Sequence, residues 1–208
     1  SVDLVDPFVD LYKIGSGDIS WLDIIDYIID KNKPVLIATG ASTNEDVSRV
    51  MTMALKKTKE IVLMQCNTNY TGADENYNYC NLNVLKKFSK DYPNIVLGLS
   101  DHTAGHATTL GAIALGARVI EKHFTDDNNQ EGPDHGFAMN PQSWRDMVDR
   151  SYELLVSLGD GVKIVEKNEE QSKLVQRRCV RVKTNLKKGH ILLESDLISL
   201  RPISEGGF

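Results

Sequence analysis

The sequence is poor in cysteine and lacks any long apolar run. Only Cys66, Cys80 and Cys179 occur among the 208 residues, and no two are spaced as a Cys-x-x-Cys pair. This pattern argues against a disulfide framework and a thiolate zinc site, and it favours a reducing compartment. No run approaches the roughly 18 apolar residues of a membrane span, and no charged-then-apolar leader is recognised. We therefore expect a cytoplasmic protein without a membrane partner.

Basic charge is also scarce. The chain has 24 Lys and Arg against 29 Asp and Glu, a net charge of −5. Such a balance supplies no positive field for nucleic acid or for an anionic membrane surface, although a local pocket for a small anion is compatible with it. The length allows one domain with a substantial core, with or without an appendage.

Five short apolar runs recur with helical patterns between them. Most are nearly continuous rather than alternating, which is typical of parallel strands buried on both faces, so the pattern predicts an α/β architecture. Helices are predicted from the capping residues Ser42 and Thr43 onward, between residues 104 and 117, and from Pro141 to about Leu158. The predicted strands are residues 11–15, 34–39, 60–65, 94–98 and 118–122.

Polar residues follow every one of these strands. In a (β/α)8 barrel the catalytic groups occupy those C-terminal strand ends. Five strands cannot close an eight-stranded barrel, so we expect about three further βα units upstream, at roughly 30 residues each. An open, doubly wound five-stranded sheet fits the length too, but it uses only the strand ends near its switch point. We rank it second.

The composition of the sequence changes after Gly161. Residues 166–176 form a charged helix or linker, and β-type residues flank a turn at Lys188-Gly189. The sequence therefore predicts a partial barrel over residues 1–162, a linker over 163–177, and a small second module over 178–208 that is cut short at its end.

Two histidines close neighbouring predicted strands. His102 and His123 stand at equivalent ends, each near a carboxylate, Asp101 or Glu121. Equivalent positions on adjacent strands lie about 4.8 Å apart, so both imidazoles could reach one divalent ion at bonds of about 2.1 Å. Histidines at strand ends are also often plain hydrogen-bonded residues, but the matched pair favours a metal site. His106 is expected at the surface, in the first turn of the helix.

Five ordered motifs resemble one known family. The chain is similar to the sialic acid synthases, which make the nonulosonic acids N-acetylneuraminate, legionaminate and pseudaminate. The resemblance extends over essentially the whole chain. It implies a (β/α)8 TIM barrel followed by an antifreeze-protein-like (SAF) domain, with this chain holding five βα units and the start of the SAF domain. The motifs are Lys13-Ile-Gly-Ser-Gly-Asp18, Ser-Asp-His102-Thr, Glu-Lys-His123-Phe-Thr, Gly-Pro-Asp134 and Arg177-Arg with Gly189 and Arg201-Pro202.

The resemblance implies a condensation of phosphoenolpyruvate with an open-chain N-acetylated hexosamine and release of phosphate. The sugar would be N-acetylmannosamine or a diacetamido-dideoxy hexose, and Gly136-Phe-Ala-Met139 is slightly more like legionaminate-type members. A homodimer is implied, because the family's SAF domain lends an arginine to the neighbouring active site. That arginine is expected beyond Phe208.

The resemblance also implies roles for individual residues. His102 and His123 would hold Mn²⁺, with Mg²⁺ or Co²⁺ as substitutes, acting as a Lewis acid on the sugar aldehyde, and Asp134 would join them as a catalytic residue. Phosphoenolpyruvate would be bound by Lys13 and Ser16. The complete implied substrate-binding set is Lys13, Ser16, Asp18, Thr68, Tyr70, Ser100 and Asp134.

Two positions depart from the family pattern. Thr68 stands where neuraminate synthases often have asparagine, and Asp18 stands where glutamate is common, so its side chain has a shorter reach. Without the resemblance, Lys13 reads as an exposed lysine, Tyr70 as a half-buried core aromatic and Asp134 as a turn residue.

Two other functions are weighed against this one. A synthase for octulosonate or heptulosonate phosphates would also condense phosphoenolpyruvate, but it would lack the trailing segment over residues 177–202. A non-catalytic sugar-binding barrel fragment would bind sugar without metal and release no phosphate.

Overall fold

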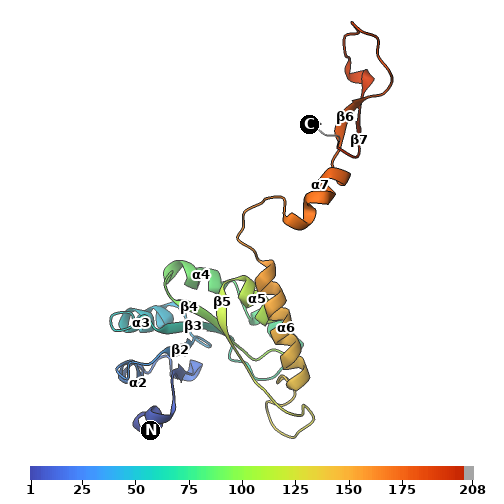
Figure 1. Ribbon diagram of the computed structural model, residues 1–208. Helices are drawn as coiled ribbons and strands as arrows, with labels where there is room; N and C mark the ends of the chain where they lie inside the picture. The colour runs from blue at the N-terminus through green and yellow to red at the C-terminus, as the bar shows by residue number, and fades with distance from the viewer. Residues whose placement is uncertain (204–208) are drawn as a thin grey trace. The chain divides into compact units, whose positions relative to one another are not determined.

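The computed structural model describes residues 1–203. The chain divides into two compact units, Ser1–Gly159 and Asp160–Phe208. The first unit is an α/β structure around one parallel sheet (Figure 1), whose strands lie in the order β1-β2-β3-β4-β5. These strands are β1 (Tyr12–Ile14), β2 (Val35–Ala38), β3 (Ile61–Cys66), β4 (Val96–Asp101) and β5 (Ala117–Lys122).

Helices connect the successive strands. A doubly wound sheet requires a reversal of strand order at its switch point, and this sheet has none, so the sequential order favours the barrel-type interpretation over the open-sheet alternative. No helix among residues 1–203 is long and apolar enough to cross a membrane. The α-helices of this unit are α1 (Val2–Val5), α2 (Leu22–Ile29), α3 (Asn44–Ala54), α4 (Val84–Asp91), α5 (Ala107–Ala114) and α6 (Pro141–Ser157), and its 3₁₀ turns are η1 (Asp6–Phe8), η2 (Ser16–Asp18) and η3 (Asp74–Tyr79).

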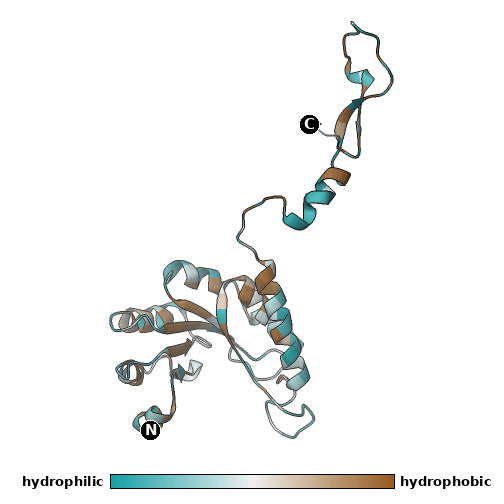
Figure 2. Cartoon of the chain, viewed as in Figure 1, coloured by the Kyte–Doolittle hydropathy of each residue, from teal (hydrophilic) through white to brown (hydrophobic). Residues whose placement is uncertain are grey.

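One face of the sheet forms the hydrophobic core with the helices. Side chains alternate along a strand, so Ile37 and Leu63 point to the helices together with Leu99 and are almost fully buried. Apolar colour dominates β2 and β3 in Figure 2. The alternate residues of the same strands point to the opposite face, which carries the candidate site.

The helix starts follow the capping residues predicted from sequence. Thr43 and Asp46 form a reciprocal capping box at the start of α3, and Asn140 forms one with Ser143 at the start of α6, where Pro141 occupies the first turn. Because caps satisfy the free amide groups of the first turn, the boundary at Pro141 is confirmed.

Two boundaries differ from the prediction. Strand β4 extends to Asp101, because Ser100 and Asp101 stay in register with Glu121 and Lys122 of β5. Polar residues do not end a strand whose backbone remains paired. Helix α5 is shorter than predicted, since residues 103–106 form a bend in which Gly105 has a φ of 64°.

The second unit contains a short helix and an antiparallel strand pair. Cys179 pairs with Leu200, and the two strands are separated by residues 183–196, which include the predicted turn at Lys188-Gly189. Residues 204–208, the end of the predicted second module, lie outside the described residues. The elements of this unit are η4 (Lys167–Glu169), α7 (Glu170–Gln176), β6 (Cys179–Val182), η5 (Glu194–Asp196) and β7 (Leu197–Leu200).

Candidate functional site

The two predicted metal ligands lie side by side. His102 directly follows β4 and His123 directly follows β5, and their ring centroids are 5.1 Å apart. Tyr70, from the loop after β3, lies 4.2 Å from the His102 ring and 5.7 Å from the His123 ring, centroid to centroid. The Phe137 ring lies 5.2 Å from the His123 ring, centroid to centroid. The predicted pairing of the histidines is therefore present in the fold.

Each imidazole is oriented through its Nδ1 atom. His102 Nδ1 lies 2.9 Å from the carbonyl oxygen of Asn67, to which it can donate, and His123 Nδ1 lies 3.3 Å from Asp134 Oδ2. A histidine that donates through one ring nitrogen presents the other as a lone pair, which is the usual arrangement of metal-binding histidines. Because Nδ1 of His102 contacts the Asn67 carbonyl, the hydrogen bond of His102 with the Cys66 thiol involves Nε2, and a ligand at that atom would replace the thiol contact.

This donor set fits a divalent ion. Two imidazoles, each held by a second group, are compatible with a divalent ion such as Mn²⁺ or Co²⁺ that takes its other ligands from oxygen atoms. Among residues 1–203 no group of three or more His, Cys, Asp and Glu side chains is arranged to hold a metal.

A cysteine next to the pair changes the electrostatics. Burial lowers the pKa of His102, but its hydrogen bonds with the Cys66 thiol and the Asn67 carbonyl raise it by more, so the net shift is upward. For Cys66, burial raises the pKa of the thiol, and the hydrogen bond with His102 leads the effects that lower it below its usual value. Proximity to a cationic imidazole is a known cause of such a shift.

Three polar side chains gather around Gly40, which follows β2. Ser16 Oγ accepts a hydrogen bond from the Gly40 amide at 2.9 Å. A methyl group at Gly40 would lie 1.7 Å from Thr68 Oγ1, 2.7 Å from Ser16 Oγ and 3.0 Å from Cys66 Sγ. The site thus brings Ser16 and Thr68 together because glycine lets the chain approach closely there.

Lys13 reaches from one edge strand of the sheet to the other. Its ammonium lies 2.7 Å from Glu121 Oε2, although Lys13 is on β1 and Glu121 is on β5. Ser100 is the register partner of Glu121 on β4. Lys13 and Ser100 therefore share the face that carries the histidines, and Glu121 joins them.

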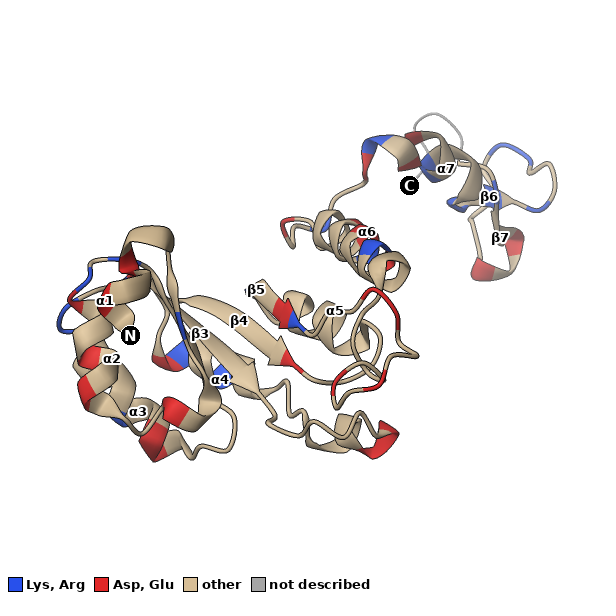
Figure 3. Ribbon diagram, turned by 90° about the horizontal axis from the view of Figure 1, so that it is seen from below, with Lys and Arg blue, Asp and Glu red and all other residues tan. Residues whose placement is uncertain are grey.

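The two carboxylates next to the histidines do not act alike. Asp101 does not face the histidine pair, because alternation along β4 turns it to the helix side, where it contacts Lys122. Charged residues are seen at the C-terminal ends of β4 and β5 in Figure 3. Glu121 lies on the site face but pairs with Lys13. For Asp18, within residues 1–203, no hydrogen bond or ion pair to another candidate residue is found.

Sequence reasoning missed Cys66, Gly40, Phe137 and the carbonyl of Asn67. The first three belong to patterns that also occur in ordinary cores and turns, and a backbone carbonyl has no sequence signal.

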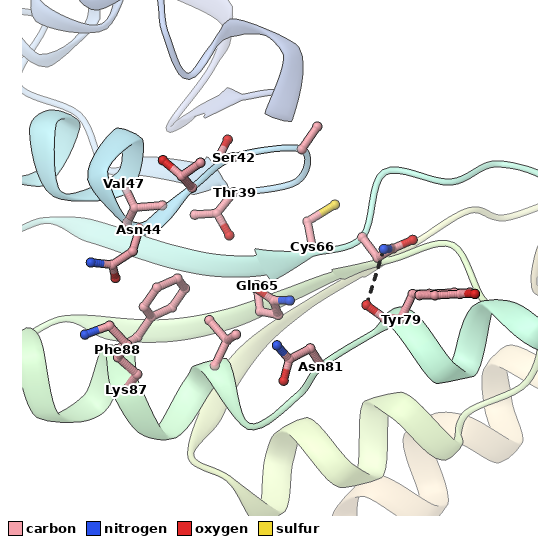
Figure 4. Close-up of a pocket in the computed structure, with 14 residues that line it drawn as sticks. Thr39, Ser42, Asn44, Val47, Gln65, Cys66, Tyr79, Asn81, Lys87 and Phe88 are labelled. Atoms are coloured by element: carbon pink, nitrogen blue, oxygen red, sulfur yellow. Dashed lines mark hydrogen bonds between the residues drawn. The ribbon is translucent and has the colours of Figure 1, made fainter.

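A further polar cavity of about 490 Å³ lies beside α3 and α4 (Figure 4), lined by residues such as Thr39, Asn44 and Gln65. The Gln65 side-chain amide donates a hydrogen bond to the Cys80 carbonyl at 2.9 Å.

Comparison with known proteins identifies the family. The NeuB family pattern matches residues 1–163. The chain belongs to the NeuB family. It is 34% identical over 206 residues to the N,N'-diacetyllegionaminic acid synthase of Campylobacter jejuni, a match that covers 97% of this chain and 60% of that protein. The chain thus spans about three-fifths of the length of this curated relative.

Solved structures of NeuB relatives share the fold. The sialic acid synthetase of Leptospira borgpetersenii, solved with citrate, superposes with a TM-score of 0.72 at 25% identity, covering 79% of this chain and 56% of that one. The spore coat polysaccharide biosynthesis protein SpsE of Bacillus subtilis gives 0.71 at 28% identity, covering 96% and 60%. The recognition of the sialic acid synthase family from sequence motifs is confirmed.

Proposed function

We propose that the protein is a nonulosonic acid synthase that condenses phosphoenolpyruvate with an open-chain N-acetylated hexosamine and releases phosphate. The observation that carries the proposal is the adjacency of His102 and His123, with Tyr70 in contact with both rings and Asp134 beside His123. A non-catalytic sugar-binding barrel would have no need for two adjacent imidazoles that are each oriented through Nδ1.

The anion site would be built around Lys13. Its ammonium now faces Glu121, and the phosphate or carboxylate of phosphoenolpyruvate would bind it in competition with that carboxylate. The hydroxyls of Ser16 and Ser100 would add hydrogen-bond donors, and Thr68 beside Ser16 would take the place that asparagine has in many neuraminate synthases. Asp18, in η2, would extend toward the sugar with a shorter side chain than the glutamate common in the family.

The reaction proceeds by three bond changes. The enol carbon of phosphoenolpyruvate attacks the sugar aldehyde carbon, water adds to the resulting oxocarbenium carbon, and the tetrahedral intermediate expels phosphate. Water gives up both of its protons: one goes to the sugar oxygen, and the other leaves with the phosphate as the tetrahedral carbon becomes the ketone. Asp134 would carry the first of these protons. Tyr70 would orient the sugar. Mn²⁺, Mg²⁺ or Co²⁺ held by His102 and His123 would supply Lewis-acid polarisation of the aldehyde oxygen.

The substrate we favour is a diacetamido deoxy hexose, as for a legionaminate synthase. The support is the similarity to the Campylobacter jejuni enzyme over nearly the whole chain, together with Gly136-Phe-Ala-Met139. N-acetylmannosamine is the second candidate. Synthases of octulosonate or heptulosonate phosphates are less favoured, because the similarity to the legionaminate relative covers 97% of this chain.

The surrounding architecture is part of the same proposal. We infer that the five strands belong to a (β/α)8 barrel over residues 1–162, that residues 163–177 link it to a second module, and that the β6 and β7 pair begins an SAF domain. A homodimer in the cytoplasm would follow from this assignment. The experiment is solution scattering and sedimentation of the complete gene product, where a monomer would contradict the dimer.

The activity is tested by phosphate release. The complete gene product is assayed with phosphoenolpyruvate and either N-acetylmannosamine or a 2,4-diacetamido-deoxy hexose, with and without Mn²⁺. We expect metal-dependent release that His102→Ala lowers by at least about a hundredfold. His106→Ala is the matched control, since His106 lies at the start of α5 and contacts Asp146 rather than the site. No release with either sugar would overturn the synthase assignment.

A further inference from the structure

A buried ion pair lies directly behind the histidine pair. Lys122 Nζ is 2.5 Å from Asp101 Oδ2, and the two side chains are 1% and 5% exposed. Lys122 also donates to the carbonyl oxygen of Thr103 at 2.7 Å. Thr108 donates to Asp101 Oδ2 at 2.6 Å, and the Thr103 hydroxyl donates to the same carboxylate at 2.9 Å. Both charges therefore have several hydrogen-bond partners.

The position of this pair along the sheet is informative. Asp101 and Lys122 are the last residues of β4 and β5 in register, and His102 and His123 are the next residue of each strand. Backbone pairing between these two strands thus ends one residue before the histidines. Beyond that point the ion pair joins the two strand ends through side chains. The Lys122 ammonium contacts Asp101 and Thr103, the residues on both sides of His102.

Stability alone does not account for such a pair. Moving two charges out of water costs about as much as their attraction returns, so a buried ion pair is often replaceable by apolar residues without loss of stability. Fixing one geometry is a better-attested use of buried polar networks. Here the geometry fixed is the relative placement of two strand ends.

We propose that Asp101 and Lys122 are positioning residues that set the separation and orientation of His102 and His123 for metal binding. This inference rests on the proposed metal site. Neither side chain touches the substrate face, because alternation along the strands directs both of them to the helix side. They act through the backbone of the residues that carry the imidazoles.

The test is Mn²⁺ affinity measured by calorimetry on the folded, complete gene product. We expect Asp101→Asn and Lys122→Met each to weaken Mn²⁺ binding by about 10- to 100-fold, as for other groups that orient metal ligands. Lys122→Arg keeps the charge and should recover most of the affinity. Thr109→Val is the control, since Thr109 is fully buried on α5 and contacts Met147 instead.

A double variant separates positioning from stability. Asp101→Asn combined with Lys122→Met leaves no unpaired buried charge, so its melting temperature should return toward that of the wild type, whereas its Mn²⁺ affinity should stay at least about tenfold weaker. Wild-type affinity in a folded double variant would overturn the inference while leaving the proposed function intact. A wild-type protein that binds no Mn²⁺ would overturn the metal site and this inference together.

Discussion

The two faces of the five-stranded sheet are built from alternate residues of the same strands, and only one of them carries the candidate site. On the helix side, Ile37 and Leu63 are completely buried in an apolar core. On the other side, Lys13, Ser100 and His102 form a polar surface around the candidate site. One strand therefore contributes to the stability of the fold and to its chemistry within successive residues.

The difference shows how each kind of position tolerates change. A helix-side position is restricted by volume, because the core is close-packed. A site-side position is restricted by chemistry and distance, as the Nδ1 contacts of the two histidines illustrate. The end of β4 is an exception on the helix side, since Asp101 and Lys122 place two buried charges on a face that is otherwise mostly apolar.

Truncating a core side chain should give the largest effect on stability. Leu63 is 0% exposed, so Leu63→Ala should lower the free energy of unfolding by about 2–5 kcal/mol. Leu63→Met, which preserves volume, should cost less than about 1.5 kcal/mol. Chemical denaturation measures both. Phosphate release per folded molecule should stay unchanged. A loss of activity in the fully folded Ala variant would contradict the view that helix-side residues affect stability alone.

Adding one methyl group beside the candidate site should lower activity rather than stability. Gly40→Ala would place a carbon 1.7 Å from Thr68 Oγ1 and 2.7 Å from Ser16 Oγ, so both hydroxyls must move. Displacement by about 1 Å can cost up to about a hundredfold in rate, and we expect that upper range in kcat/KM for phosphoenolpyruvate. Gly111→Ala on helix α5 is the matched control, since its added methyl group meets only Leu82 Cδ1, at 2.7 Å, and no candidate-site residue. Equal kinetics for the two variants would contradict the prediction.

Sequence patterns predicted the strands well because burial on both faces leaves a continuous apolar signal. They placed β2 and β3 to within a residue or so, and they predicted that His102 and His123 would lie together. They ended β4 too early, because Ser100 and Asp101 are polar and their partners lie about twenty positions later in the chain.

The site contacts that sequence could not supply depend on tertiary placement. Glu121 was read as a neighbour of His123, yet it pairs with Lys13 across the sheet. Asp101 was read as a neighbour of His102, yet it faces Lys122 on the helix side. Consecutive residues of a strand point to opposite faces, which separates Asp101 from His102. Glu121 and His123 share a face, but the carboxylate of Glu121 is directed to Lys13.

The smallest effect should come from the helix cap that lies outside both faces. Asp46 Oδ2 accepts hydrogen bonds from the Thr43 amide at 2.9 Å and the Thr43 hydroxyl at 2.8 Å, and these bonds hold the pKa of Asp46 below its usual value. A lowered folded-state pKa adds stability above the unfolded-state pKa near 3.8, and that stability is lost as the pH falls through the folded value. Asp46→Asn should therefore reduce stability at neutral pH and flatten its decline below pH about 4. The free energy of unfolding measured from pH 7 to 2 tests this prediction. Glu45→Gln, in the same first turn, is the control. Parallel pH profiles for Asp46→Asn and the wild type would refute it.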